Sequence, residues 1–484
     1  MARFNDAREP AQPRTVNLAG GRAYRQSDKL TLAGILLTSF LDDQYYRSAD
    51  QTLAELVELT QSVDPLFAAK AAVYVRTQFG VRSVTHVVAG ETAARVKGEQ
   101  WPKRFYDAVV TRPDDVTEIL AYYASAYGLH PLPNSLIKKG LAHALRGFDD
   151  YQLAKYHGRG KRIGRVDAVN LCHPKATAPL TRLMSGALPP ADTWEVALTH
   201  AGQDAGNEPE KASLKRETWQ RLLRERRLGY FALLRNLRNI IEAGGTEAVE
   251  IATQQIADER AIRASHVLPF RFPAAIKSIA TLAPPGVITA LEQALEIAFD
   301  NVPELDGMTL VAVDSSGSMT WQEGGSRPVE KAILLAMAVV KRSQSDVLLF
   351  DEEARFVSVD PAATFACTMD RLKNEIRGGG TSFPAIFDAA EKPYDRVIIL
   401  SDMQAWVEDD WGFGHPGPAF ERYKLRTGAR PAVYCFDLQG YGTMQFPAHR
   451  VFQLAGYSEK VFDVMPKLEE DREALAHAIE AVVF

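Results

Sequence analysis

Four short apolar runs in the last third of the chain limit its possible folds more than any other feature. Each run has the length of a buried strand and ends in an aspartate, and helical patterns alternate with these runs, which are residues 308–314, 346–351, 396–402 and 431–437. Continuous apolar strands between helices indicate a doubly wound, mainly parallel α/β sheet. Ligands of such sheets bind at the carboxyl ends of the strands, so the terminal aspartates are candidates for a functional site: Asp314, Asp351, Asp402 and Asp437.

The sequence before about residue 300 has a helical pattern instead. Apolar residues recur at intervals of three and four in segments that each open with an aspartate suited to capping a helix, namely residues 50–63, 64–79 and 114–128. The clearest helical segment, residues 213–245, has one apolar stripe, carries arginines on its other face and ends at a glycine pair. We therefore expect an all-α domain over residues 26–300 with no strand before residue 305, preceded by a loose polar arm of residues 1–25.

Length and composition predict a soluble chain with more than one domain. The 484 residues exceed what one ordinary core accommodates, and 46% hydrophobic with 24% charged residues is typical of globular proteins. No apolar run reaches the roughly 18 residues of a membrane helix, and the first residues lack the apolar centre of a secretory signal. Three cysteines provide neither a disulfide framework nor a metal-binding spacing. These features predict a cytoplasmic protein without a membrane partner.

The first apolar run ends in the cluster Asp-Ser-Ser-Gly-Ser at residues 314–318. A nucleophilic serine on a strand-to-helix turn requires Gly-x-Ser-x-Gly, but no glycine precedes this serine pair. Two of the later histidines, His415 and His449, lie in no catalytic context. A phosphate loop requires a glycine-rich run that ends in Gly-Lys-Ser or Gly-Lys-Thr, and the next lysine is Lys331. The cluster therefore favours neither a serine hydrolase nor a nucleotide-binding loop.

A metal site agrees better with this cluster. Asp314, Ser316 and Ser318 are alternate residues of a turn at a strand end, so their oxygen atoms can face one point. Mg²⁺ prefers oxygen ligands in near-octahedral geometry. Two further elements supply oxygen atoms, because Thr381 lies in a glycine-rich loop before a helix and Asp402 ends a neighbouring strand.

This order of residues resembles the metal-ion-dependent adhesion site of von Willebrand factor A domains, whose fold is Rossmann-like, and the resemblance covers residues 305–484. It implies that an acidic group of a partner protein completes the coordination of Mg²⁺, or of another divalent cation, whose protein ligands are Asp314, Ser316, Ser318, Thr381 and Asp402. The resemblance thus implies capture rather than catalysis, and a polar turn without metal is the plain alternative. Asp351 and Asp437 are interpreted as solvated strand-end acids or loop caps.

Charge separates the two parts of the chain. Residues 1–300 contain 38 Lys and Arg against 33 Asp and Glu, whereas the other 184 residues contain 18 against 28. Residues 151–240 alone contain 16 basic and 8 acidic residues. Such a local excess is expected of a surface that binds a polyanion, although exposed helices also carry surplus arginine without a function.

The most basic segment is residues 151–176. It combines Tyr156 with six cationic or titratable side chains, which are Lys155, His157, Arg159, Lys161, Arg162 and Arg165. Gly158, Gly160 and Gly164 break a helical pattern and predict a loop. Arg and Lys contact phosphates, while Tyr and His can stack on unpaired bases, so RNA or DNA binding and a merely solvated loop are both open.

The whole arrangement resembles the Ro autoantigen family. The resemblance rests on Lys155-Tyr156-x-x-Arg159, then Leu-x-His173 and Lys175, and on the motifs RSVTHVVAGE at 82–91 and HVLPFRF at 266–272. It implies that residues 26–300 are a TROVE module, a ring of HEAT-like helical repeats closed by the von Willebrand A-like domain. The predicted RNA-binding residues are Lys155, Arg159, Lys161, Arg162 and His173. The two motif histidines, His86 and His266, are expected to be packed.

The family resemblance also implies a function. The ring would take single-stranded 3′ ends of misfolded non-coding RNAs through its centre, while structured Y-like RNAs would bind its outer basic surface. We expect a monomeric, non-catalytic ribonucleoprotein component that acts in RNA quality control or processing, and an exoribonuclease or another protein with an acidic loop as candidate partner. Two alternatives stay open. One is a metal-dependent protein-interaction adaptor with incidental RNA binding, and the other is a metal hydrolase that depends on Asp402.

Overall fold

The structure, a computed structural model, divides the chain into two compact units. The sheet unit comprises Met1–Ser62, Leu305–Pro361 and Asp370–Ala478, and the helical unit comprises Val63–Glu304, Ala362–Met369 and Ile479–Phe484. The residues described in these units are 14–18, 22–25, 27–38, 48–128, 135–156, 161–191, 193–203, 206–321, 327–405, 416–446, 448, 450–455, 462, 465 and 474–484. Outside them lie His157, Gly158, Arg159, Gly160, His415 and His449.

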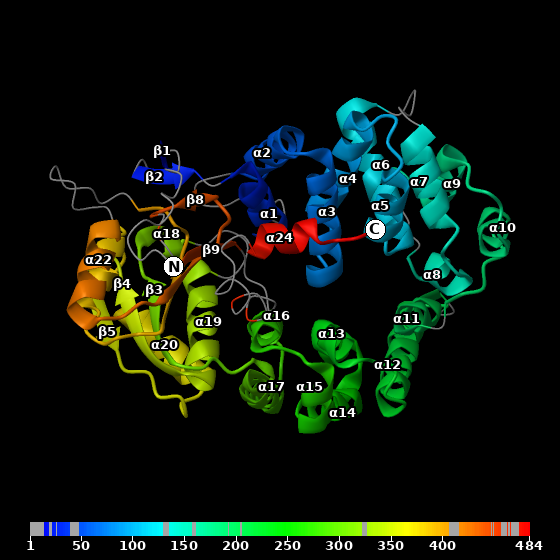
Figure 1. Cartoon of the computed structure of the whole chain (residues 1–484). Helices are drawn as coiled ribbons and strands as arrows, with labels where there is room; N and C mark the ends of the chain where they lie inside the picture. The colour runs from blue at the N-terminus through cyan, green and yellow to red at the C-terminus, as the bar shows by residue number, and fades with distance from the viewer. Residues whose placement is uncertain are drawn as a thin grey trace. The chain divides into compact units, whose positions relative to one another are not determined.

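A six-stranded sheet forms the centre of the sheet unit (Figure 1). Its order is β5-β4-β3-β6-β7-β9, and every neighbouring pair is parallel except the antiparallel edge pair of β4 and β5. Its strands are β3 (Met308–Asp314), β4 (Gln344–Phe350), β5 (Ala354–Val357), β6 (Arg396–Ser401), β7 (Ala432–Asp437) and β9 (Val451–Ala455). The four strands predicted from the apolar runs are thus present, and the predicted doubly wound, mainly parallel sheet is confirmed.

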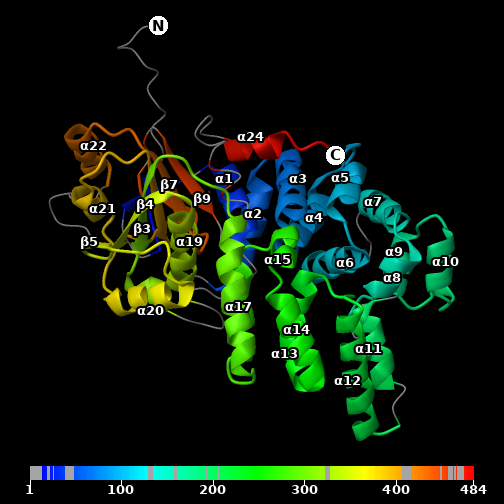
Figure 2. The same ribbon diagram turned by 90° about the horizontal axis from the view of Figure 1, so that it is seen from below.

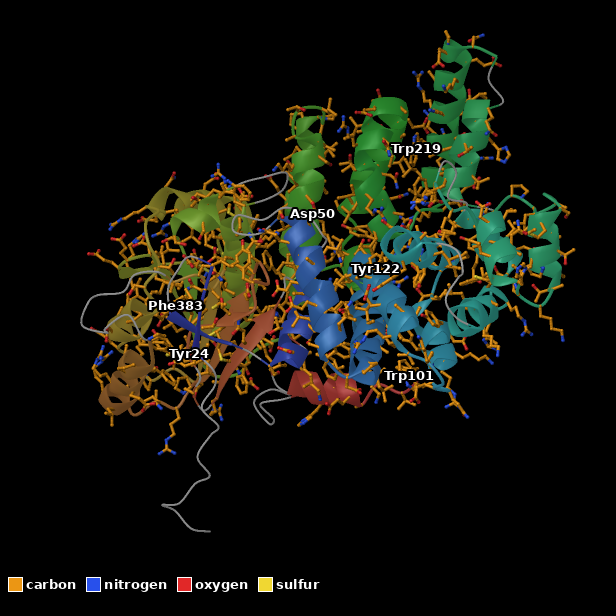
Figure 3. The ribbon with its side chains drawn as sticks, turned by 90° about the horizontal axis from the view of Figure 1, so that it is seen from above. Tyr24, Asp50, Trp101, Tyr122, Trp219 and Phe383 are labelled. Carbon is orange, nitrogen blue, oxygen red and sulfur yellow. The ribbon has the colours of Figure 1, made fainter. Side chains whose placement is uncertain are left out.

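Helices pack on both faces of this sheet (Figure 2). Phe383 and Phe387 of α21, with Phe420 and Tyr423 of α22, form a buried cluster with alternate residues of the strands. Helix α19 packs against β3, β4 and β6 outside this cluster and therefore covers the other face. The helices of this region are α18 (Gly317–Thr320), α19 (Pro328–Arg342), α20 (Phe365–Glu375), α21 (Phe383–Ala389), α22 (Pro416–Thr427) and α24 (Ala474–Glu480). Figure 3 labels Phe383 inside this layered core.

The start of the chain corrects one prediction. Two strands, β1 (Arg14–Val16) and β2 (Arg22–Arg25), form a three-stranded antiparallel sheet with β8 (Thr443–Met444), whereas the sequence predicted a loose arm and no strand before residue 305. These strands are too short for an alternating apolar pattern, and their partner lies about 420 residues away. Helices α1 (Asp28–Thr38) and α2 (Ala49–Ser62) also belong to the sheet unit, where α1 packs against β9.

The helical unit contains α-helices and short 3₁₀ or π turns, and no strand among its described residues. Its helices pack mainly on near neighbours in the sequence, as in α3 with α4, α11 with α12 and α13 with α14 (Figure 2). This pattern is that of stacked helix pairs. The helices are α3 (Pro65–Tyr74), α4 (Ser83–Arg95), α5 (Pro102–Val109), α6 (Pro113–Tyr127), α7 (Ser135–Leu145), α8 (Asp150–Lys155), α9 (Arg165–Cys172), α10 (Ala178–Met184), α11 (Trp194–Gln203), α12 (Glu208–Arg224), α13 (Tyr230–Ala243), α14 (Gly245–Ile256), α15 (Glu259–Ser265), α16 (Phe272–Ile279) and α17 (Pro285–Ala298).

Two helical segments differ from their predicted form. The apolar stripe of residues 213–245 belongs to two helices, α12 and α13, because Arg226 has a φ of 50° and Gly229 caps the second helix. Trp219 of α12, labelled in Figure 3, stacks on Trp194 of α11. The predicted loop of residues 151–176 contains all of α8 except its first residue, and all of α9. Gly164 starts α9 rather than only breaking a helix, since its amide donates to Asp167 Oδ2 at 2.8 Å.

Among the helices of the described residues, none combines the length and the apolar character that crossing a membrane requires.

Candidate functional site

The turn after β3 holds Asp314 by hydrogen bonds from two sides. Its Oδ1 accepts the amide proton of Ser316 at 2.8 Å, so the side chain caps its own turn. Its Oδ2 accepts the hydroxyl proton of Ser401, the last residue of the neighbouring strand β6, at 2.5 Å. Asp314 is fully buried. Its carboxylate is therefore fixed at the carboxyl edge of the sheet.

The hydroxyl groups of this turn lie beside a glycine-rich loop. The Oγ atoms of Ser316 and Ser318 are 3.3 Å apart, and both residues are buried. The amide of Gly317 donates to the carbonyl oxygen of Gly379 at 3.1 Å, which places this loop against the turn. Gly379 has a φ of 118°, a conformation that favours glycine. Thr381 follows two residues later and is also buried.

Asp402 reaches the same edge from the next strand. Strands β3 and β6 are parallel, with Val313 opposite Leu400, so the residues that follow both strands lie side by side. The Asp402 carboxylate accepts a hydrogen bond from the side chain of Ser318 and another from the amide of Gln404, the latter at 3.1 Å. The structure thus brings Asp314, Ser316, Ser318 and Asp402 together, and it places Thr381, the fifth predicted ligand, in the loop that contacts their turn.

Both carboxylates of this cluster have a raised pKa. Burial raises the pKa of Asp314, and hydrogen bonds from Ser316 and Ser401 offset this only in part. Burial and the charge of Asp314 raise the pKa of Asp402 well above its usual range. Within the described residues, neither carboxylate forms an ion pair with Lys, Arg or His.

The donor set fits a hard divalent cation. Two carboxylates and three hydroxyl groups are all oxygen ligands, and the positive charge would offset the repulsion between the two acids. No three His, Cys, Asp or Glu side chains of the described residues converge on one point. A cation held here would therefore depend on the Ser and Thr hydroxyl groups as well as on the two aspartates.

The other two strand-end aspartates are loop caps. Asp351 Oδ2 accepts the hydroxyl proton of Ser315 and pairs with Arg355, both at 3.0 Å. Asp437 accepts the amide protons of Gly440 at 2.7 Å and of Gly442 at 2.9 Å. Both aspartates are buried rather than solvated. Their oxygen atoms are thus already occupied within the fold.

The predicted RNA-binding residues that the structure describes lie in and after α8 of the helical unit. Lys155 is the last residue of α8, is partly exposed, and its Nζ donates to the phenol oxygen of Tyr151 at 3.4 Å. Lys161 and Arg162 are exposed shortly before α9. Lys161 forms an ion pair with Glu118 of α6. Cationic groups thus lie on the surface where α6, α8 and the start of α9 meet.

His173 lies at the end of α9. Its side chain is exposed, and its φ of 51° places it in the left-handed region, where it ends the helix. The preceding Cys172 is buried, so the two side chains are not presented together. His173 is therefore accessible to a ligand from solvent.

Two family models match the chain in succession. The TROVE domain model matches residues 37–189 and 187–286, which together are more than half of the chain, and the Ro60 vWA domain model matches residues 308–468. This chain belongs to the TROVE-domain family of Ro proteins. The predicted family is thereby confirmed, and so is the predicted order of a helical region followed by a von Willebrand A-like domain.

Relatives of this Ro-family chain include a bacterial protein. The RNA-binding protein RO60 of Deinococcus radiodurans is 24% identical in an alignment that covers 87% of this chain and 88% of that protein. The crystal structure of the Deinococcus radiodurans RO (RSR) protein matches with a TM-score of 0.60 and 21% identity, over 85% of this chain and 93% of that chain, which supports the fold. Telomerase protein component 1 of Rattus norvegicus is 24% identical over 51% of this chain but only 12% of its own length.

The sequence indicates the acids and hydroxyls of the Ro60-type domain, but two further groups support them in the structure. The Ser401 hydroxyl binds Asp314, and the Ser-Asp dipeptide at the end of the third apolar run was a signal for it. The backbone amide of Gln404 donates to Asp402 Oδ1. The side-chain oxygen of Gln404 accepts the backbone amide proton of Leu18 at 2.7 Å. No local pattern indicates that second contact, because it joins residues 386 positions apart.

A buried cluster of the TROVE domain explains the motif at residues 82–91. Asp115 Oδ1 lies 2.9 Å from Nε2 of His86 and 2.8 Å from Nη2 of Arg82, and its Oδ2 lies 2.9 Å from Nη2 of Arg76. Burial alone would raise the pKa of Asp115, but the hydrogen bond from His86 and the charge of Arg76 outweigh burial and hold this pKa well below its usual range. His86 is packed, as predicted, whereas His266 is exposed with a φ of 51°, so that prediction was wrong.

Proposed function

We propose that this chain is an RNA-binding protein whose helical unit contacts the phosphate backbone. The observation that carries the proposal is the group of accessible basic side chains around α8 and α9, in a chain of the Ro family. Lys155, Lys161, Arg162 and His173 are at least partly exposed there. Phosphate contacts by such groups supply most of the affinity for RNA, so binding should weaken steeply as salt increases.

We propose further that the preferred ligands are misfolded or structured non-coding RNAs with a single-stranded 3′ end, together with Y-like RNAs. The family resemblance supports this choice of RNAs. The name of the Deinococcus radiodurans relative supports RNA binding itself. A single strand exposes its bases and phosphates to side chains, whereas a duplex hides the faces of its bases. The protein would then act in RNA quality control or processing in the cytoplasm, as a monomer.

Binding of one structured RNA with and without a 3′ tail tests this function. The two RNAs have the same duplex and differ only in the single-stranded extension, so filter binding at moderate salt isolates the contribution of the free end. We expect the tailed RNA to bind clearly more tightly. A charge reversal, Lys155→Glu with Arg159→Glu, should weaken binding of the tailed RNA. Equal affinities for the tailed and the blunt RNA would contradict the preference for 3′ ends.

We infer a second function for the sheet unit, the metal-dependent capture of an acidic protein partner. Its support is the pair of buried carboxylates, Asp314 and Asp402, without an ion-pair partner among the described residues. Mg²⁺ or another divalent cation held by them with Ser316, Ser318 and Thr381 would leave a position for one carboxylate of a partner, such as an exoribonuclease. The cation would supply Lewis-acid attraction for that carboxylate.

Two double variants separate RNA binding from this adaptor function. Asp314→Ala with Ser316→Ala should abolish Mg²⁺-dependent capture of a peptide with an acidic loop and leave RNA binding unchanged. The reversal at Lys155 and Arg159 should have the opposite effect. Loss of RNA binding in the first variant would contradict separate functions.

We propose capture rather than bond cleavage for the metal cluster. Incubation of the tailed RNA with the protein and Mg²⁺ tests this proposal, and we expect the RNA to stay intact. Cleavage that disappears in Asp402→Asn would instead support a metal hydrolase.

A further inference from the structure

An aromatic and cationic cluster lies at the end of α8, and the function proposed above uses only its lysine. Tyr151 and Lys155 lie about one helical turn apart, and Nζ of Lys155 is 3.4 Å from the phenol oxygen of Tyr151 and 5.5 Å from the centre of its ring. The ring centre of Tyr156 is 5.6 Å from the same nitrogen. The ammonium group of Lys155 therefore lies beside two aromatic rings.

The two rings differ in their access to a ligand. The guanidinium carbon of Arg112 lies 4.0 Å from the ring centre of Tyr156, which is close stacking. Arg112 is itself held by both carboxylate oxygens of Asp114, at 3.0 and 2.8 Å. Tyr156 thus has a face covered by a fixed cation. Tyr151, in contrast, is 45% exposed. Within the described residues, Lys155 is the one cation that lies near its ring.

The short helix that carries Tyr151 is fixed to its neighbours. Asp149 accepts the amide proton of Gln152 at 2.7 Å and caps the helix. Asp150 binds the guanidinium group of Arg182 in α10 through two hydrogen bonds of 2.9 and 2.6 Å. Leu153 is fully buried. A ring on such an anchored helix is preorganised, so a ligand that stacks on it loses less free energy to the ordering of the protein.

The surroundings of this ring fit one nucleotide of a single strand. Lys155 offers a charge for a phosphate next to a base that lies on Tyr151. Lys161 adds a second charge in the same region. It pairs with Glu118 of α6, which lies one helical turn from Asp114. Asp114 is the residue that holds Arg112. An accessible aromatic ring beside a cation that can bind phosphate is the combination that recognises unpaired nucleotides. Inside a duplex, neighbouring bases already cover both faces of each base.

We propose that Tyr151 stacks on one unpaired base of the bound RNA while Lys155 contacts an adjacent phosphate. The inference rests on the proposed RNA-binding function and deepens it. It assigns base stacking to a residue that charge and motif spacing do not indicate.

The test compares two ligands of equal length and charge in fluorescence anisotropy. One is a single-stranded oligouridylate, which forms little structure of its own, and the other is an abasic ribose-phosphate oligomer without bases. The full-length variants are Tyr151→Ala, Tyr151→Phe and Lys155→Ala. The matched control is Phe356→Ala, which removes an aromatic ring of similar exposure, 47%, from β5 of the sheet unit.

We expect Tyr151→Ala to bind the oligouridylate roughly ten-fold more weakly, as stacking on one base would predict, and to bind the abasic oligomer as the wild type does. Its salt dependence should be unchanged, because no charge is removed. Tyr151→Phe keeps the ring and should bind like the wild type. Lys155→Ala should weaken both ligands and reduce the slope of log K against log salt by about 0.7 for one phosphate contact on a single strand. The Phe356→Ala control should bind both ligands normally.

The outcomes separate this inference from the function on which it rests. Wild-type affinity of Tyr151→Ala for the oligouridylate would overturn the stacking proposal and leave RNA binding intact. Equal weakening of both ligands would also overturn it, because the lost contact would not then involve a base. Failure of the wild-type protein to bind either ligand would overturn RNA binding itself.

Discussion

The molecule contains two buried carboxylate sites that differ in how their charge is balanced. In the helical unit, Asp115 contacts Arg76, Arg82 and His86, and its pKa is held low. In the sheet unit, Asp314 and Asp402 are held by hydroxyl and amide donors, and their pKa values are raised. The charge of Asp115 is compensated inside the fold, whereas no cationic side chain of the described residues pairs with the acids at the sheet edge. Charge balance rather than burial therefore distinguishes a structural acid from a candidate ligand.

The largest expected effect comes from removal of the compensated acid. Asp115→Ala should lower the free energy of unfolding by about 3–5 kcal/mol, because Arg76 would stay buried without its carboxylate. Urea unfolding followed by circular dichroism measures the loss. The control is Glu242→Ala, which breaks the exposed pair with Arg238 in the same unit and should cost about 0.5 kcal/mol or less. Similar losses in both variants would remove the distinction between the two kinds of acid.

The uncompensated pair should respond to a cation instead. Mg²⁺ at about 100 times its Kd should stabilise the wild-type protein by about 2.7 kcal/mol, and Asp402→Asn should abolish this gain because it removes a charged ligand. Thermal unfolding with Mg²⁺ or with EDTA measures both. Asp388→Asn, which changes an exposed acid paired with Arg422, should keep the full response. An undiminished response in Asp402→Asn would place the cation elsewhere.

The same Asp402→Asn variant should behave differently in EDTA. There it should be at least as stable as the wild type, because a neutral amide beside Asp314 avoids the repulsion between two buried acids. A marked loss of stability in EDTA would show that the ionised acid is compensated after all.

Acidification should act on the two sites with opposite signs. The folded-state pKa of Asp115 lies below its unfolded value, so its contribution to stability is complete above about pH 4 and is lost as the pH falls further. The raised pKa values of Asp314 and Asp402 mean that the folded state binds their protons more tightly, so protonation relieves rather than destabilises the sheet edge. The effect at Asp115 should be smaller than that of truncation, because protonation keeps the volume of the side chain.

Urea midpoints of the wild type and Asp115→Asn, measured from neutral to acidic pH, isolate this effect from that of other carboxylates. The difference between the two proteins should shrink as the pH falls below about 4. A constant difference would mean that the charge of Asp115 contributes nothing.

The smallest effect is expected at an exposed cation that already has a partner. Lys161→Ala should weaken RNA binding only about two- to five-fold, because its charge is partly offset by Glu118 and screened by solvent. Anisotropy titrations at two salt concentrations measure this change. Lys392→Ala in the sheet unit, which breaks an exposed pair with Asp346, is the control and should leave binding unchanged. A loss at Lys161 as large as that at Lys155 would mean that the two cations contribute equally.

Much of the fold could be predicted from local pattern. Continuous apolar runs between helices indicated the strands, and apolar spacing of three and four residues indicated the helices. What failed depended on distant partners. Strand β2 exists because β8 pairs with it from far along the chain, and the 213–245 segment bends where Arg226 adopts a positive φ between two helices that each bury their own face. Neither the pairing nor the bend has a signature within a short window of sequence.

The sequence by itself determined which acids meet at the sheet edge, because strands of a parallel sheet bring their carboxyl ends together and place Asp314 beside Asp402. It also determined where positive charge is concentrated. Only the tertiary structure decided which buried acid is compensated by a cation and which aromatic ring is accessible. Arg76 compensates the charge of Asp115 from a different helical segment. Arg112 covers the ring of Tyr156 but not that of Tyr151, and it also comes from a different helical segment. The physical reason is that strand direction is a local property, whereas charge balance and the exposure of a ring are set by neighbours that only folding supplies.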